Sequence, residues 1–259
     1  MTAAVPTPLD IKLMNMAASA LFAIGLLLFA AAGAWWAVRH PLFSIAGITV
    51  QGDVTHNSAP TLRANVAPQL AGNFFTIDLA AARKAFQAVP WVRQAIVKRE
   101  FPNRLRVLLQ EHQAVAFWGD ESESRLLNAQ GEVFEANVGD VEQEDLPRLA
   151  GPDDQGAQVL AMYRALKPLF EPLDLGVQQL VLTPRGNWQV GLDNGSTVEL
   201  GRGTRAEVAA RTQRFVHTVT QVASRHGRTP AALVSADLRY AEGYAVRLRG
   251  VATTGDGKK

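Results

Sequence analysis

The hydrophobic and polar positions divide the chain into an unbroken apolar run and two longer stretches with helix or strand periodicity. The apolar run covers residues 16–38 and contains no charged side chain. At about 1.5 Å per residue, a helix of this length crosses the ~30 Å hydrocarbon core of a bilayer. Trp35 and Trp36 near its end are typical of the membrane interface, and Pro41 blocks further helix. We therefore expect a transmembrane helix at 16–38 after a tail at 1–15.

A cleaved signal peptide is the alternative for this run, because Ala30-Ala31-Ala32-Gly33 resembles a cleavage site. The run is longer than a signal peptide's apolar region and continues past that site, which favours an uncleaved anchor. The flanking charges of Asp10, Lys12 and Arg39 nearly balance, so the positive-inside rule leaves the orientation open.

The first periodic stretch predicts a strand, two helices and a hairpin, which is a compact α+β unit of β-α-α-β-β order over residues 43–112. Ser58 and Asp78 are the expected N-caps of the two helices. In the return strand of the hairpin, Leu105, Val107 and Leu109 alternate with polar residues and should face the core. The strands are expected at 43–50, 92–100 and 104–111.

The second stretch, residues 113–250, predicts short strands and two amphipathic helices, and we interpret it as a mostly antiparallel β domain with flanking helices. The helices are expected at about 159–170 and 204–226, where apolar residues recur every three or four positions. Strands are expected at 114–118, 125–128, 132–135, 177–183, 187–192, 197–200, 234–238 and 244–248. Residues 251–259 are short, polar and Gly-rich, which predicts a flexible tail.

Composition and charge narrow the function class. The 259 residues are 47% hydrophobic with a formal net charge of only +2, which suits packed domains and argues against nucleic-acid binding. The absence of cysteine excludes disulfides, thiolate metal sites and a cysteine nucleophile.

One segment carries a pattern that enzymes use. Residues 201–206, Gly-Arg-Gly-Thr-Arg-Ala, fit a relaxed dinucleotide-binding motif between a strand and a helix. The preceding strand returns from an Asn194-Gly195 hairpin, whereas this motif belongs to a parallel βαβ unit, so a tight turn that caps the helix is the simpler interpretation. The five histidines form no metal-binding pair, and the acidic stretch at 142–145 suits a solvated loop. We expect no catalytic residue, cofactor, metal or small-molecule substrate, hence no enzyme.

Several local segments, taken in order with the anchor, resemble the FtsQ/DivIB family of bacterial cell-division proteins in its proteobacterial form. They are Pro90-Trp91-Val92, Val97 to Pro102 with Leu105, Gly201-Arg202-Gly203, and Asp237 to Tyr240 with Gly243. The resemblance covers nearly the whole chain. It implies a POTRA domain after the anchor, a cytoplasmic N-terminus, a periplasmic bulk and a place at the septum in the cell inner membrane.

The resemblance also implies partners and contact residues. The family acts as a divisome scaffold that binds FtsB and FtsL in an FtsQBL complex, with FtsK and FtsW as further partners, and helps to control septal peptidoglycan synthesis. The expected FtsB contacts, assigned to the last strand as a sheet edge, are Arg185, Arg239, Tyr240, Glu242, Gly243 and Tyr244. The expected contacts on the POTRA strand, for upstream partners such as FtsK, are Val97 and Arg99.

Structural alternatives remain at these positions. Tyr240 and Tyr244 could serve ordinary packing, and Val97 and Arg99 could lie on a plain strand with the valine inward and the arginine in water. An envelope assembly or secretion factor with a POTRA domain is the alternative function, and an anchored envelope hydrolase is a further one.

Overall fold

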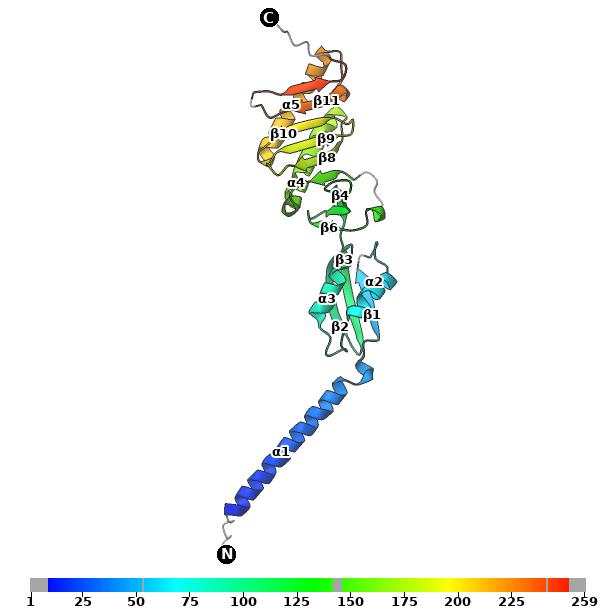
Figure 1. Ribbon diagram of the computed structural model, residues 1–259, viewed down its shortest axis with the longest axis vertical. Coiled ribbons are helices and arrows are strands. Elements are labelled where there is room, and N and C mark those ends of the chain that lie inside the picture. The colour runs from blue at the N-terminus through cyan, green and yellow to red at the C-terminus, as the bar shows by residue number, and fades with distance from the viewer. Residues whose placement is uncertain (1–8, 53, 142–145, 241, 252–259) are drawn as a thin grey trace. The chain divides into compact units, whose positions relative to one another are not determined.

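The computed structural model describes residues 9–52, 54–141, 146–240 and 242–251 (Figure 1). The folded part divides into two compact units at the bond between Glu111 and His112. The predicted tail at 251–259 and the acidic stretch at 142–145 fall almost entirely outside the described residues.

Helix α1, Leu9–Val38, is a single helix of 30 residues with no buried residue. The predicted span at 16–38 forms its C-terminal part, and the helix begins seven residues earlier, so that Asp10 and Lys12 lie on its first turns. A helix this long and apolar, buried against nothing in the protein, fits a single-pass membrane anchor. A short 3-10 helix, Pro41–Phe43, follows it.

The first unit confirms the expected β-α-α-β-β order. Its sheet has the order β1-β3-β2, with β1 parallel and β2 antiparallel to the central β3. The strand predicted at 43–50 is displaced, because the 3-10 helix occupies Phe43 and the strand starts at Gly47. The elements are β1 Gly47–Gly52, α2 Ala59–Val66, the 3-10 helix Ala67–Gln69, α3 Leu79–Gln87, β2 Val92–Glu100 and β3 Arg104–Glu111.

The core of the first unit lies between this sheet and its two helices. The predicted inward residues of β3 are buried, and Val107 packs in one cluster with Leu62 of α2 and Phe86 of α3. Burial of each such side chain contributes about 1.5–3 kcal/mol. The Ser58 and Asp78 side chains accept hydrogen bonds from the first backbone N–H groups of α2 and α3, as predicted.

The second unit holds a nine-stranded sheet with the order β12-β11-β10-β9-β8-β7-β4-β5-β6. Five of its eight described pairings are antiparallel and three are parallel. The strands are β4 Ala114–Trp118, β5 Arg125–Asn128, β6 Val133–Glu135, β7 Arg148–Ala150, β8 Val177–Leu182, β9 Trp188–Leu192, β10 Thr197–Gly201, β11 Leu233–Asp237 and β12 Ala245–Leu248.

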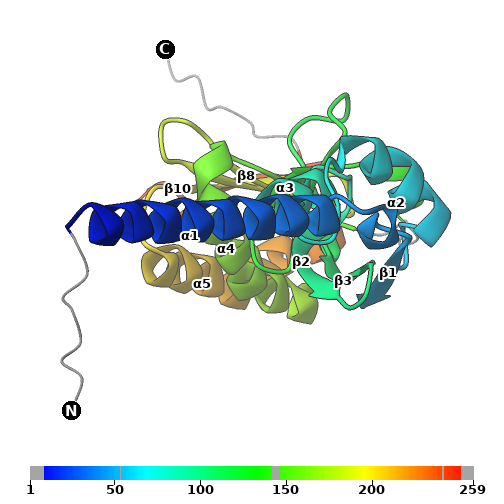
Figure 2. The same cartoon turned by 90° about the horizontal axis from the view of Figure 1, so that it is seen from below.

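Two helices, α4 Gly156–Phe170 and α5 Arg205–Arg225, pack beside each other on the same side of the sheet (Figure 2). Trp188 from β9 and Phe215 from α5 lie in the core beneath them and are almost fully buried. Both helices lie close to their predicted positions, because their apolar stripes alone determine which face is buried.

Strand β7 is the element that the sequence did not predict. It has only three residues and lies between Pro147 and Gly151-Pro152, which indicate a loop. Parallel pairing with β4 on one side and β8 on the other holds it in place. Its strand conformation therefore depends on distant neighbours rather than on local sequence.

Candidate functional site

The N-terminus of α5 is fixed by a reciprocal cap. Thr204 Oγ1 accepts from the Glu207 N–H at 3.4 Å, and Glu207 Oε2 accepts from the Thr204 N–H at 2.8 Å. These hydrogen bonds hold the pKa of Glu207 below its usual range. The Arg211 guanidinium bonds to the carbonyls of Leu200 and Arg202, which ties the helix to the end of β10.

The prediction that this glycine turn lies outside a parallel βαβ unit was wrong. Strand β10 is antiparallel to β9 as predicted, yet it pairs in parallel with β11, so β10, α5 and β11 form a βαβ unit. The glycine turn thus has the topology that the sequence seemed to exclude. The side chains of Glu207 and Arg211 occupy the space over this turn, where a Cβ added at Gly203 would lie 3.0 Å from Glu207 Oε2.

The edge of the nine-stranded sheet next to α5 is β12, which pairs antiparallel with β11. The contact residues predicted on a last strand instead lie on the connection between β11 and β12, before β12 begins at Ala245. Leu238 anchors the start of this connection, because it is buried and its N–H donates to the Glu199 carbonyl at 2.8 Å. The connection therefore projects beside α5 as a loop.

Arg239 is held by Asp237, two residues earlier in the sequence. Its Nε and Nη2 donate to the two carboxylate oxygens of Asp237 at 2.9 and 2.7 Å. This paired contact lowers the pKa of Asp237 and raises the pKa of Arg239. The arginine is thus oriented before any partner arrives.

The two tyrosines of the connection have different surroundings. Tyr244 packs edge-on against Phe215 at 5.0 Å, and its hydroxyl lies 2.7 Å from Thr218 Oγ1. Tyr240 exposes 61% of its surface. The packing alternative therefore describes Tyr244, whereas Tyr240 presents an aromatic ring to solvent.

A pocket of about 350 Å³ lies between α5 and this connection. It joins Tyr240, Glu242, Gly243 and Tyr244, four of the residues predicted from the family resemblance. The helix side of the pocket was not predicted from the sequence, although its residues recur at helical spacing. Those residues are Arg211, Arg214, Phe215, His217 and Thr218.

A second pocket, of about 670 Å³, adjoins the first and shares Tyr240, Arg211 and Arg214 with it. Arg202 and Arg239 add positive charge, and Glu207 is the carboxylate among its described lining residues. Arg185 lies elsewhere, on the exposed turn before β9, two residues from Asn187 of this pocket. The surface around Tyr240 is therefore basic and suits an acidic segment.

The residues predicted on the POTRA strand are placed differently. Val97 pairs with Val107 and packs against the core of the first unit. Arg99 lies on the same face of β2, and its Nε and Nη2 donate to the carbonyls of Phe74 and Ile77 at 2.6 and 2.8 Å. Val97 thus lies inward, as the plain-strand alternative has it, and Arg99 is exposed to water but is also bonded to main-chain carbonyls.

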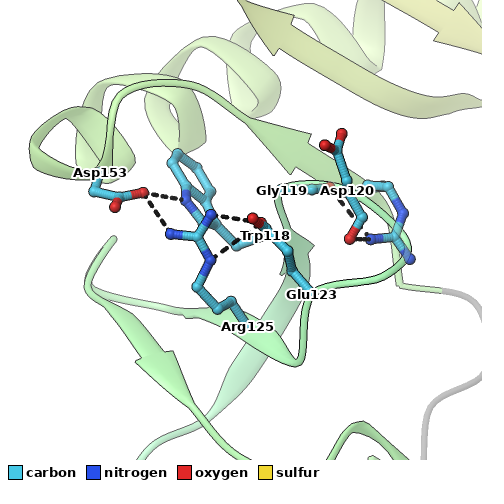
Figure 3. A network of polar contacts seen from close by, with 7 residues as sticks. Trp118, Gly119, Asp120, Glu123, Arg125 and Asp153 are labelled. Atoms are coloured by element: carbon cyan, nitrogen blue, oxygen red, sulfur yellow. Dashed lines mark hydrogen bonds and ion pairs between the residues drawn. The ribbon is translucent and has the colours of Figure 1, made fainter.

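Two carboxylates of the second unit, Glu123 and Asp153, take part in a polar network beside β4 (Figure 3). Arg125 bonds to Glu123 and, at 2.8 Å, to Asp153, which also accepts from the Trp118 indole N–H at 3.1 Å. The indole hydrogen bond and the Arg125 charge hold the pKa of Asp153 below its usual range. Asp153 therefore joins the Trp118 indole to the Arg125 guanidinium.

Comparisons with known proteins agree with this architecture. Residues 43–112 match the family model "POTRA domain, FtsQ-type", and residues 116–239 match "Cell division protein FtsQ/DivIB, C-terminal". A "Cell division protein FtsQ" of Burkholderia pseudomallei is 41% identical over 96% of this chain and 99% of its own length. The relative of the same name in Thiomonas arsenitoxydans is 40% identical over 97% of this chain and 92% of its own.

A third relative, the "Cell division protein FtsQ" of Bordetella pertussis, is 38% identical and covers 92% of both chains. The anchor, the β-α-α-β-β unit and the larger mixed sheet follow one another in the order that the resemblance predicted. The chain belongs to the FtsQ/DivIB family of cell-division proteins, and its role is that of a membrane-anchored division scaffold.

Proposed function

We propose that the chain recruits late division proteins by adding a partner strand to β12 and seating partner side chains in the pocket beside Tyr240. The partners implied by the family are FtsB and FtsL, as an FtsQBL complex, with FtsK and FtsW as further candidates. In this proposal the N-terminus is cytoplasmic, the two folded units are periplasmic, and the chain acts at the septum to control peptidoglycan synthesis.

One observation carries the proposal: a short strand that comes last in the sheet formed by the described residues lies next to an exposed aromatic residue and a pocket. An edge strand has main-chain N–H and C=O groups that a partner strand can pair with. Strand β12 has four residues and follows directly after the connection that lines the pocket. Backbone pairing would supply affinity, and the pocket would select the side chains of the partner.

The charge around the pocket indicates the kind of segment that fits. Arg214 lines both pockets, Arg202 lines the second, and Arg247 is exposed on β12. An FtsB segment with a carboxylate near an apolar side chain would match this surface, since guanidinium groups bind carboxylates in a paired geometry. Arg185 would extend the contact to the turn before β9.

The test is a binding titration of the full-length protein, in single-copy lipid nanodiscs, with a periplasmic FtsB segment. We expect Tyr240→Ala to weaken binding by about 2 kcal/mol, roughly 30-fold, as for an interface hot spot. Gly243→Pro should also weaken binding, because it constrains the connection that leads into β12.

Ile96→Ala is the control, because Ile96 is a comparably exposed apolar residue on β2 of the first unit. It should bind the FtsB segment as the wild type does. Equal affinity of the wild type and both site variants, with the fold intact by circular dichroism, would rule out this site.

A further inference from the structure

The first unit carries an exposed apolar cluster that includes neither Val97 nor Arg99, the two residues predicted there as partner contacts. Leu42, Phe75 and Phe101 expose 70%, 47% and 77% of their surfaces. They come from three separate segments: the 3-10 helix after α1, the loop before α3, and the turn between β2 and β3. We call this cluster the aromatic rim and include in it Phe43 and Phe74.

Ring contacts show that the rim is one surface. The ring of Phe75 packs edge-on against Phe43 at 4.8 Å and against Phe74 at 5.2 Å. The ring of Phe74 lies 6.1 Å from that of Phe101. Three segments that are distant in sequence thus converge on one aromatic patch, which is larger than the isolated apolar residues normal on a soluble surface.

Backbone hydrogen bonds fix the three segments to one another. The Phe74 N–H donates to the Phe43 carbonyl at 2.8 Å, and the Ala46 N–H donates to the Asn103 carbonyl at 2.9 Å. The Arg99 guanidinium holds the loop from the other side through the carbonyls of Phe74 and Ile77. The rim is therefore preorganised: Leu42, Phe75 and Phe101 are exposed, and the buried Phe74 forms part of the base beneath them.

Chain length limits how far the rim can be from the membrane. Helix α1 ends at Val38, and Phe43 follows five residues later. Five residues span at most about 18 Å when fully extended. The headgroup layer on each side of a bilayer is about 5–8 Å thick, so a rim tethered this closely can reach it.

The charges beside the rim suit a lipid surface. Arg39 and Arg104 lie close to the rim in sequence, and the Arg104 side chain lies over Gly47 at the start of β1. The nearby carboxylates are already engaged, since Glu100 is paired with Arg106 and Asp78 caps α3. Aromatic rings with flanking cations are the composition that proteins place at the membrane interface.

We propose that the aromatic rim docks on the headgroup region of the same bilayer that holds α1 and fixes the first unit against the membrane. The proposal rests on membrane anchoring by α1 and is independent of FtsB binding at the second unit. Contact of the rim with the bilayer would limit the orientations available to the first unit.

The test uses the absence of cysteine in the chain, which permits single nitroxide labels. The full-length protein carries one label at a time, through Phe101→Cys, Phe75→Cys, Gln110→Cys or Leu27→Cys, in nanodiscs that hold one copy each. Gln110 is exposed near the far end of β3, about 20 Å from Arg104 along the strand. The readout is the accessibility of each label to lipid-soluble oxygen and to a water-soluble nickel complex.

We expect the labels at 75 and 101 to be shielded several-fold from the nickel complex relative to the label at 110. The label at 27 should lie in the hydrocarbon, which establishes insertion of α1. With the reporter at 75, Phe101→Asp should move the label toward water, whereas Phe101→Leu should not. Nanodiscs with phosphatidylglycerol should strengthen the shielding relative to phosphatidylcholine alone, because of Arg39 and Arg104.

Equal aqueous accessibility at 101 and 110, with the label at 27 buried in lipid, would overturn the proposal while leaving the anchor intact. Shielding that occurs only in vesicles with many copies would also overturn it, since the rim would then contact a second copy. Neither result would affect FtsB binding, which Tyr240→Ala tests separately.

Discussion

The two folded units differ in how they hold the arginines that were predicted as partner contacts. In the first unit, the important ties join residues distant in sequence: Glu111 holds His56 and Asn57, and Arg99 holds the loop around Phe74. Around the candidate site of the second unit, Arg239 is bound by Asp237, two residues away. The polar contacts of Glu111 and Arg99 therefore stabilise the fold of the first unit. In the second unit, the connection between β11 and β12 is organised by local contacts, and its Tyr240 stays exposed.

An exposed side chain is therefore not always available to bind a partner. Arg99 and Arg239 were both predicted as partner contacts, and both are largely exposed residues. The Arg99 guanidinium is committed to main-chain carbonyls, so a change there should disturb the first unit itself. Changes around Tyr240 should disturb binding and leave the fold intact. Four substitutions test that contrast, from the largest expected effect to the smallest.

Glu111→Ala should have the largest effect. The Glu111 carboxylate is buried and accepts hydrogen bonds from the backbone N–H groups of His56 and Asn57 and from Asn57 Nδ2 at 2.9–3.0 Å. Removal leaves buried donors unsatisfied and should cost about 3 kcal/mol. Amide hydrogen exchange of the full-length protein should show faster exchange across the first unit only, and Glu111→Gln should show a smaller change. Unchanged exchange in the first unit would contradict the assigned role of these ties.

Arg99→Ala should have an intermediate effect, because it removes two short hydrogen bonds from the loop before α3. The loss should be about 1–3 kcal/mol, and exchange should speed up locally at residues 74–77. Arg99→Lys is the matched control: it keeps the charge but not the two-pronged contact. If both variants behave like the wild type while recruitment of an upstream partner fails, Arg99 is a contact residue rather than a structural one.

Tyr244→Phe should have a smaller effect and should act in the second unit. It removes the hydroxyl contact with Thr218 and keeps the ring against Phe215, at a cost of about 0.5–1.5 kcal/mol. Thr218→Val removes the other partner of this contact, together with the hydrogen bond from Thr218 Oγ1 to the Arg214 carbonyl. A double-mutant cycle on thermal unfolding should show coupling between the two changes. Fully additive losses would mean that the contact contributes nothing.

The smallest effect should come from pH at the Asp237–Arg239 pair. The pKa of Asp237 is lowered in the folded protein. The pair therefore stabilises the folded protein at pH values above the ordinary aspartate pKa near 4, and this stabilisation is lost as the pH falls through the lower pKa of the folded state. The effect is small, since the Arg239 side chain is largely exposed and water screens the pair. Asp237→Asn should remove this part of the pH dependence of thermal unfolding. If the variant and the wild type show the same pH dependence, the pair contributes nothing.

The sequence predicted those parts of the fold in which a local pattern determines the structure. The N-caps Ser58 and Asp78, the stripe of α5 and the alternation in β3 all appear as expected. Strand β7 and the parallel pairing of β10 with β11 depend on contacts between distant segments, and no local pattern encodes them.

The candidate site was predicted only in part, for a similar reason. Family resemblance indicated Tyr240 and Gly243 but assigned them to a strand, whereas they lie on the connection before β12. The helical residues Phe215 and Thr218 had the spacing of a packed face and nothing that marked them as a pocket wall. The contact of Tyr244 with both residues becomes visible only when α5 and the connection are placed together.

The most direct test of the account follows amide hydrogen exchange at Ala245–Leu248 while a periplasmic FtsB segment is added to the full-length protein. Strand β12 is paired with β11 on one side, so a partner strand added on the other side should slow exchange in β12. The account predicts protection at β12 and around Tyr240 in the wild type, and its loss in Tyr240→Ala. Tight binding of the segment with no added protection at 245–248 would contradict strand addition at this edge.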